Sequence, residues 1–172
     1  MEFVRTIVIS EFSDFNDLGE FIIVVVRLLM AALLGGLLGL EREQSGKPAG
    51  IRTHMLVCMG AAVFVLIPQQ AGISDADMSR VIQGVVSGIG FLCAGSIITR
   101  QNDLFATGLT TAAGIWFTAA IGMAVGLGRE QTAVVCTLLA WVVLYVVPFF
   151  SRTITKKKAE RPESNEDSPG MK

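Results

Sequence analysis

The chain has 172 residues, of which 52% are hydrophobic and only 17% are charged, and its mean hydropathy is +0.59. Soluble domains carry roughly 25% charged residues, so this composition excludes an ordinary soluble domain and indicates a membrane protein. The net charge of −1 offers no basic surplus, and we expect no nucleic-acid partner. Its three cysteines lie far apart in apolar runs, a pattern typical of packing residues, and we expect no cofactor.

Residues 1–20 are rich in acids and contain one short apolar patch without a cleavage site, so we expect an external N-terminal segment rather than a signal peptide. Five apolar windows follow, each close to the roughly 20 residues that a membrane-crossing helix needs. The runs are continuous rather than alternating, which favours helices over strands. We therefore predict an all-α integral membrane protein, a bundle of five transmembrane helices within residues 21–150. The predicted spans are 21–40, 54–71, 81–99, 108–127 and 132–150.

The distribution of lysine and arginine predicts the orientation of these spans. If the N-terminus lies outside, the inner segments carry ten basic residues and the outer segments carry only Arg5, Arg80 and Arg129. Short loops that are rich in basic residues stay in the cytoplasm. We therefore predict a cytoplasmic C-terminus and a cytoplasmic tail over 151–172. After Lys158 that tail is polar and almost without apolar residues, which is typical of disorder.

Glycines recur at a spacing of four in three of the predicted spans. Lipid gives helices little hydrophobic reason to associate, so small residues that allow close backbone approach supply much of the packing. The segment VSGIGFLCAG has the spacing GxGxxxxG without a flanking strand, which favours packing over nucleotide binding. We expect a large side chain at Gly88 to force packed helices apart. The predicted helix-packing glycines are Gly35, Gly39, Gly84, Gly88, Gly90, Gly95, Gly122 and Gly126.

Arg27 is the one charged residue inside a predicted span. It lies about 9 Å from Phe21 along a helix that rises 1.5 Å per residue, within the outer leaflet. Intramembrane charges are costly and often functional. Its side chain either snorkels to the headgroups or turns inward. At matching depth the third span offers Gln83 and Ser87 as neutral partners for an inward Arg27.

A second polar layer is expected where four helices end at the cytoplasmic side. Successive helical residues diverge by about 100°, so neighbouring acids cannot all face one cavity, and we expect Glu41 to point inward. Magnesium prefers several oxygen ligands, which leaves Glu41 as a weak metal candidate, and we expect no catalytic residue. His54 is either a proton relay or an interfacial hydrogen-bonding residue. The residues of this layer are Glu41, Arg42, Arg52, Thr53, His54, Ser96, Thr99, Thr110 and Thr111.

Three segments together resemble the MgtC/SapB family of membrane proteins. They are RLLMAALLGGLLGLEREQSGKPAGIRTHMLVCMGAAVF, VVSGIGFLCAGSII and GLTTAAGIWFTAAIGMAVGLG, and the resemblance covers about residues 24–128. Their order is specific, whereas each segment alone is not. The motif positions carried over are Arg27, Gly36, Gly39, Glu41, Arg42, Gly50, Arg52, Thr53, Gly88, Gly90, Gly95, Gly108, Thr111 and Ala112.

The resemblance implies a multi-pass protein of the bacterial inner membrane, linked in several members to growth at low magnesium and, in pathogens, to virulence through survival inside macrophages. Longer members carry a soluble C-terminal domain, for which the segment after Ser151 is too short. We expect no enzyme, because the chain has no P-loop and no phosphorylatable aspartate motif.

Two functions of different classes remain open. The first is a regulator that binds a membrane-protein partner through its helices and influences magnesium homeostasis. The second is a small ion or solute transporter or channel, acting as a homodimer, with Arg27 and Glu41 lining its path. A membrane enzyme built on Glu41, Arg52 and His54 is the weakest alternative. All three place the protein in the lipid bilayer.

Overall fold

A computed structural model shows an all-helical chain, with the backbone described at residues 1–11, 17–97 and 107–159 and side chains at 1–8, 17–97 and 107–147. The helices are α1 (Glu2–Glu11), α2 (Leu18–Gln44), α3 (Ile51–Gln70), α4 (Asp75–Gly95), α5 (Leu109–Gly126) and α6 (Glu130–Ala159). Helices α2 to α6 are long and apolar enough to cross a membrane. The predicted bundle of five spans is therefore confirmed, while its orientation stays a prediction.

Local capping explains where the helices begin. Asp17 accepts a hydrogen bond from the backbone N–H of Glu20, and Ser74 accepts one from that of Asp77, so α2 and α4 start with N-cap side chains. The Ser74 cap adds a polar first turn to α4, which therefore begins six residues before the predicted span at residue 81. At the start of α3 the Glu43 carboxylate takes the capping role and accepts from the N–H of Ile51 at 2.9 Å.

The two ends of the chain differ from the sequence expectation. The predicted external segment contains a helix, α1, which was not foreseen. Helix α6 continues to Ala159, past the predicted boundary at residue 151, because the basic segment there contains no glycine or proline to end it. The remainder of the predicted tail, 160–172, lies outside the described residues.

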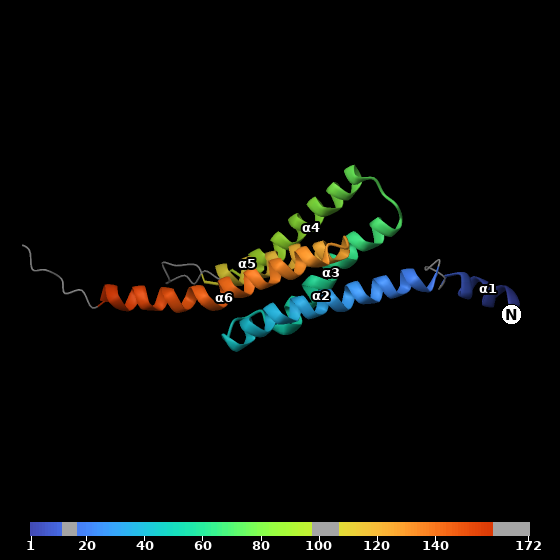
Figure 1. Cartoon of the computed structure of the whole chain (residues 1–172). Coiled ribbons are helices and arrows are strands. Elements are labelled where there is room, and N and C mark those ends of the chain that lie inside the picture. Colours follow the sequence, from blue (N-terminus) through green and yellow to red (C-terminus); the bar gives the residue numbers. More distant parts are fainter. Residues whose placement is uncertain (12–16, 98–106, 160–172) are drawn as a thin grey trace, which may run out of the picture.

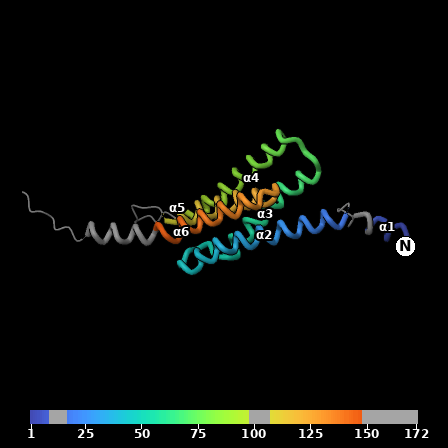
Figure 2. Tube along the Cα trace, viewed as in Figure 1, coloured from blue at the N-terminus to red at the C-terminus, as the bar shows by residue number. Residues whose placement is uncertain are grey.

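Helix α3 lies between α2 and α5. It packs on α2 along one face and on α5 along another, while α6 covers α2 and α5 and α4 touches α3 and α5 (Figure 1). The tube in Figure 2 shows α4 diverging from the other helices toward the α3–α4 turn. Buried apolar side chains between α2, α3 and α5 form the main core, with Leu38, Cys58 and Val125 among its members.

Four predicted packing glycines bring α2 and α5 against α3. A Cβ atom on Gly35 would lie 2.6 Å from the His54 carbonyl oxygen, and one on Gly39 would lie 2.6 Å from the Ile51 Cα. On the other side of α3, Cβ atoms on Gly122 and Gly126 would collide with the carbonyl oxygens of Cys58 and Ala62. Close backbone approach at these four residues therefore holds α3 between its two neighbours.

The glycines of α4 behave differently. Cβ atoms built on Gly84, Gly88, Gly90 and Gly95 would meet nothing within 4 Å. The prediction that these glycines pack helices together within the chain is therefore wrong, and so is the expectation that a large residue at Gly88 forces packed helices apart. The reason is that α4 stands at the edge of the bundle: only 6% of its apolar window is buried, against 56% for α5.

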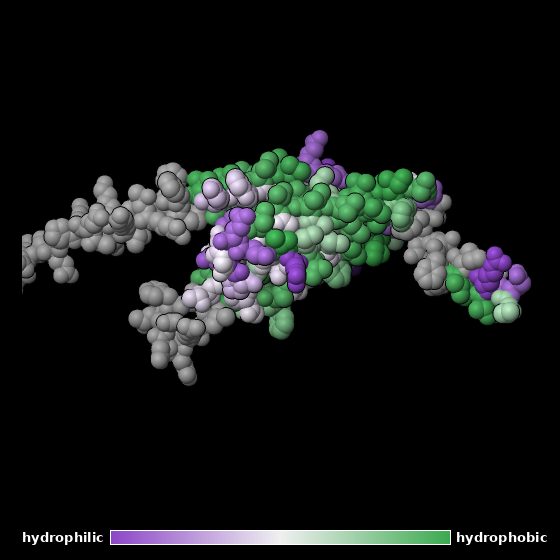
Figure 3. All heavy atoms as spheres, turned by 90° about the horizontal axis from the view of Figure 1, so that it is seen from below, coloured by the Kyte–Doolittle hydropathy of each residue, from purple (hydrophilic) through white to green (hydrophobic). Residues whose placement is uncertain are grey.

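The surface agrees with a membrane location. Figure 3 shows hydrophobic residues along most of the flank and hydrophilic residues gathered toward one end of the bundle. Large apolar side chains such as Leu33, Phe64 and Val143 are exposed in the single chain. Burial in lipid rather than in protein satisfies such side chains, because a bilayer is as apolar as they are.

We predict opposite effects for two Gly→Ala substitutions. Gly122→Ala introduces a methyl group that overlaps the Cys58 carbonyl, so it destabilises the fold by about 1–3 kcal/mol. Gly88→Ala adds a methyl group in open space and raises helix propensity by up to about 1 kcal/mol, so stability is unchanged or higher. Thermal unfolding of both variants in detergent measures this difference, and equal losses would refute the packing assigned to α5.

Candidate functional site

A buried cluster of charged and polar side chains lies where α2 ends and α3 begins. Glu41 and Arg42 of the last turns of α2 are only 8% and 3% exposed, and His54 of the first turn of α3 is fully buried. Gly39 makes this burial feasible, because it lets α2 approach the backbone of α3 at Ile51. Of the residues expected in the second polar layer, Glu41, Arg42 and His54 are therefore buried at this end of the bundle.

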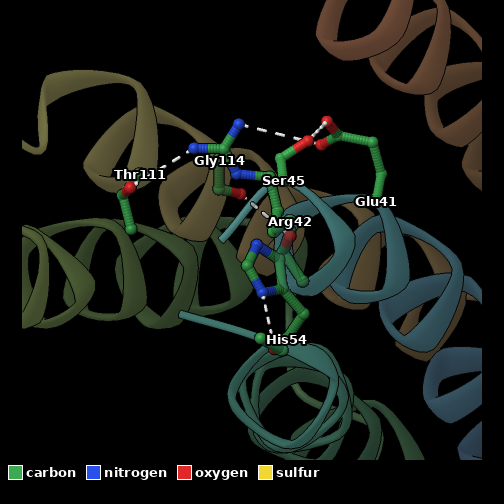
Figure 4. Close-up of polar contacts among 8 residues, drawn as sticks. Glu41, Arg42, Ser45, His54, Thr111 and Gly114 are labelled. Atoms are coloured by element: carbon green, nitrogen blue, oxygen red, sulfur yellow. Dashed lines mark hydrogen bonds and ion pairs between the residues drawn. The ribbon is translucent and has the colours of Figure 1, made fainter. Parts of the chain in front are cut away.

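Arg42 links α2 to α5. Its Nη2 donates a hydrogen bond to the Thr111 hydroxyl at 3.3 Å, and its Nη1 lies 3.7 Å from a carboxylate oxygen of Glu41. Figure 4 shows the guanidinium between Thr111 on one side and the Glu41–Ser45 pair on the other. The Nε of Arg42 has no hydrogen-bond partner among the described residues. Arg42, rather than Glu41 alone, is thus the residue that joins the helices here.

Glu41 completes a short-range network on α2. Its Oε1 accepts a hydrogen bond from the Ser45 hydroxyl at 2.8 Å, whereas its Oε2 has only the ionic contact with Arg42. Glu43 is exposed, and its carboxylate binds the N–H of Ile51 rather than joining this network. Removing two charges from water is costly, and their mutual attraction offsets that cost only while both are present.

His54 lies beside this pair. Its Nδ1 is 3.0 Å from the Gly50 carbonyl, which only accepts hydrogen bonds, so Nδ1 carries the proton. Its Nε2 has no hydrogen-bond partner in the described part of the chain. In Figure 4 the ring projects from α3 toward the region where Arg42 and Gly114 lie. The Nδ1 of His54 is thus hydrogen-bonded, whereas its Nε2 is left without a partner among the described residues.

Several residues expected in this layer lie elsewhere. Arg52 is exposed, whereas Glu41 and His54 are buried, so Arg52 does not join them in the buried cluster. Thr53 is half-buried, and Thr110 is exposed at the start of α5. The Ser96 hydroxyl donates to the Cys93 carbonyl within its own chain segment, and Thr99 lies outside the described residues.

A second cluster forms around Arg27, at the opposite end of the bundle. Its Nη1 donates to the Gly126 carbonyl at 2.8 Å and to the Gln69 side-chain oxygen at 2.9 Å, and its Nε lies 3.6 Å from a carboxylate oxygen of Glu130. Arg27 therefore turns inward and joins α2 to the ends of α3 and α5 and the start of α6. A cation is favourable at the C-terminus of α5, where carbonyls lack helical partners.

This arrangement corrects the partners expected for Arg27. Gln83 and Ser87 are both exposed on α4, which lies at the edge of the bundle. The sequence prediction missed Glu130 because it lies just outside the predicted span 132–150, and it missed Gln69 because only the third span was expected to reach the depth of Arg27. The signal was present: the predicted topology places the end of the second span and the start of the fifth at the same side as Arg27.

The two clusters are separated by apolar packing. Between Arg27 and Glu41, the buried residues of α2 are Ala31, Leu34, Gly35, Leu38 and Gly39. No group of three or more histidine, cysteine, aspartate or glutamate side chains that suits a metal ion occurs among the described residues. The Glu41 carboxylate is already engaged by Ser45 and faces a cation, so it is a poor magnesium ligand.

Comparisons with known proteins match most of the membrane region. The model of the MgtC family matches residues 28–153. The "Putative magnesium transporter YhiD" of Escherichia coli K12 is 41% identical over 71% of this chain and 59% of its own length. Protein SrpB of Synechococcus elongatus is 41% identical over 73% of this chain and 75% of its own. Protein MgtC of Salmonella typhimurium is 42% identical over 67% of this chain and 48% of its own.

The aligned region thus spans about half to three fifths of the lengths of YhiD and MgtC. No solved structure matches this chain. The aligned lengths are 130 and 115 residues for YhiD and MgtC.

We predict that Arg27 contributes to stability much more than an exposed arginine does. Arg27→Met leaves the Gly126 carbonyl, Gln69 and Glu130 without their shared donor, and it lowers the free energy of unfolding by about 1–3 kcal/mol. Arg80→Met removes only an exposed pair with Asp77 and has little effect. Thermal unfolding of the two variants in detergent measures this difference. Equal midpoint temperatures for Arg27→Met and Arg80→Met would contradict the inward role of Arg27.

For the Glu41–Arg42 pair we predict that the double variant is milder than the single ones. Glu41→Met leaves the buried Arg42 cation without its partner, and Arg42→Met leaves the buried Glu41 carboxylate without its partner. Each single substitution lowers the free energy of unfolding by about 3–5 kcal/mol, whereas replacing both residues leaves no unpaired charge. Chemical denaturation of the three proteins measures the coupling, with the exposed Arg52→Met as control. Additive losses in the double variant would show that the two charges act independently.

Proposed function

The chain belongs to the MgtC family, and from this membership together with the geometry above we propose that it regulates another membrane protein and thereby influences magnesium homeostasis. Its multi-pass helical architecture places it in a membrane, and the bacterial inner membrane is part of the proposal. The name of YhiD refers to magnesium transport, which supports the link to this ion without specifying a mechanism. No step of the proposal requires catalysis by this chain.

The observation that carries the regulatory function is a groove between α3 and α4. It has a volume of about 520 Å³, and its lining is apolar. Gly60 of α3 and Gly84 and Gly88 of α4 contribute to this lining, and added Cβ atoms on all three would meet nothing within 4 Å. Glycines on α2 and α5 make close helix contacts in this chain, whereas the three glycines along this groove have no neighbouring helix packed against them.

A groove of this kind suits a transmembrane helix of a partner protein. Association of helices in lipid depends on small residues that permit close backbone approach, and the groove presents three of them. Phe64 and Leu92 flank the glycines with apolar side chains that are exposed in the single chain. Figure 1 shows that α4, which forms one side of this groove, diverges from the other helices toward the α3–α4 turn.

Magnesium transport by a homodimer is the second candidate, and the buried Glu41–Arg42 pair is the observation in its favour. Buried charges in membrane helices often mark ion pathways. Against it, Glu41 and Arg27 stand at opposite ends of the bundle, with the close-packed residues of α2 between them. A path that uses both therefore has to run along a surface shared with a second copy rather than through one chain.

We predict that filling the groove abolishes function without harming the fold. Gly88→Leu places a side chain in open space, so the variant inserts and purifies as the wild type does. Growth at low magnesium of a strain lacking the protein is the readout, and we expect this variant to give the yield of the empty vector. Gly90→Leu is the matched control, because Gly90 lies on the same helix, is equally open to a Cβ and does not line the groove.

Full support of growth by Gly88→Leu would contradict the regulatory function assigned to this groove. Magnesium flux into proteoliposomes separates the two candidates: the regulator gives none, whereas the transporter gives a flux that Glu41→Gln reduces. A flux that is insensitive to Glu41→Gln would exclude the pathway built on the buried pair.

A further inference from the structure

A second cavity lies on the other side of α3, between α2, α3, α5 and α6. Its volume is about 320 Å³, within the range of about 300–1,000 Å³ typical of small-molecule pockets. Leu38, Phe117, Ala140 and Leu144 supply an apolar wall, and His54 and Thr110 are the polar side chains in the lining. Neither the family membership nor the proposed regulatory groove accounts for this cavity.

The Nε2 of His54 gives the cavity a hydrogen-bond acceptor. The side chain is fully buried, and its Nδ1–H is used by the Gly50 carbonyl. In the neutral ring the Nε2 is then an acceptor, and it has no partner within the described residues. An unsatisfied buried acceptor is destabilising, so a donor that enters the cavity gains a hydrogen bond that the described residues do not supply.

Gly114 keeps this acceptor accessible. A Cβ atom on Gly114 would lie 3.6 Å from His54 Nε2, at ordinary van der Waals distance, and it would cover the nitrogen without displacing it. The absence of a side chain at this position therefore leaves open space in front of the unsatisfied atom. Two independent features, the orphaned nitrogen and the missing Cβ, point into the same cavity.

The approach to the cavity is from the lipid. On its α6 side the lining residues Leu139 and Val143 are 60% and 57% exposed on the apolar flank. His54 and Thr110 are the polar side chains of a lining that is otherwise apolar, which favours an apolar occupant over a cavity filled with water. The occupant that these surfaces suit is therefore apolar over most of its length and carries one donor.

We propose that this cavity binds a neutral, membrane-dissolved alcohol or phenol, whose hydroxyl donates to His54 Nε2 while its apolar body lies against Phe117 and the facing residues of α6. A carboxylate is excluded as the head group, because it has no hydrogen to donate to this nitrogen. A quaternary ammonium head is excluded for the same reason. The hydroxyl is shared by long-chain alcohols and lipid-soluble phenols, and experiment distinguishes these two sources.

Photolabelling with a matched pair of probes tests the proposal. The full chain in lipid nanodiscs is irradiated with a diazirine-bearing octanol or with its methyl ether, which has the same apolar body but no donor. We expect saturable labelling of Phe117 and of α6 residues 139–144 to be several-fold stronger with the alcohol. Competition by 1-dodecanol and by an alkylphenol then shows which of the two molecules the cavity prefers.

Two substitutions assign that preference to the His54 nitrogen. Gly114→Ala covers Nε2 at ordinary contact distance, and His54→Phe removes it, so both are expected to bring the alcohol-to-ether ratio close to one. Gly60→Ala is the control, because Gly60 lines the opposite groove and its ratio stays at the wild-type value. If His54→Phe fails to fold, Gly114→Ala still decides the outcome.

Equal labelling of the wild type by the alcohol and the ether would overturn the proposal, as would a preference that survives Gly114→Ala. Labelling that does not saturate would indicate only partition of the probe into lipid and would overturn it as well. None of these outcomes depends on the regulatory groove or on magnesium. The proposed ligand of the cavity and the proposed function are therefore tested independently.

Discussion

The backbone contacts of α3 are the constraint on which the rest of this structure depends. Lipid supplies no hydrophobic drive for helices to associate, so the bundle needs surfaces that fit at the level of the backbone. Gly35 and Gly39 provide such a surface on α2, and Gly122 and Gly126 provide one on α5. These contacts fix the depth and rotation of α3, and through them the positions of the buried polar side chains.

The polar clusters show how the bundle uses that framework. At one end Arg42 crosses from α2 to Thr111 of α5, and at the other end Arg27 crosses from α2 to the end of α5. Both arginines therefore join the same two helices on either side of an apolar middle. A guanidinium carries donors in several directions, which allows one side chain to bind groups on several helices at once.

Much of this fold can be predicted from the sequence, because long apolar runs and their flanking charges have few alternatives in lipid. The five spans and the packing role of Gly122 follow from such patterns. What a single helix cannot reveal is which of its faces meets a neighbour. Gly84 and Gly88 carry the same motif as Gly122 and Gly126 yet pack on nothing in this chain, because α4 sits at the edge.

The sequence predicts where the candidate site lies, but it does not predict which side chains contact one another there. The sequence places Glu41, Arg42 and His54 at one depth, while only the packing shows that Arg42 reaches Thr111 and that Arg52 stays outside. Pairing depends on the rotation of each helix, which neither composition nor spacing encodes. The unsatisfied His54 nitrogen likewise becomes visible only once Gly114 of α5 lies beside it.

The position of Arg27 in the chain also has a consequence for biosynthesis. Arg27 belongs to the first long apolar helix to be made, whereas its partners Gly126 and Glu130 belong to the last two. Chains emerge N-terminal end first, so Gln69 of α3 is the first of these partners to be made, and Arg27 lacks the Gly126 carbonyl and the Glu130 carboxylate until α5 and the start of α6 follow. Closure of the bundle around Arg27 thus marks the completion of insertion, and a chain truncated before α6 retains an uncompensated charge.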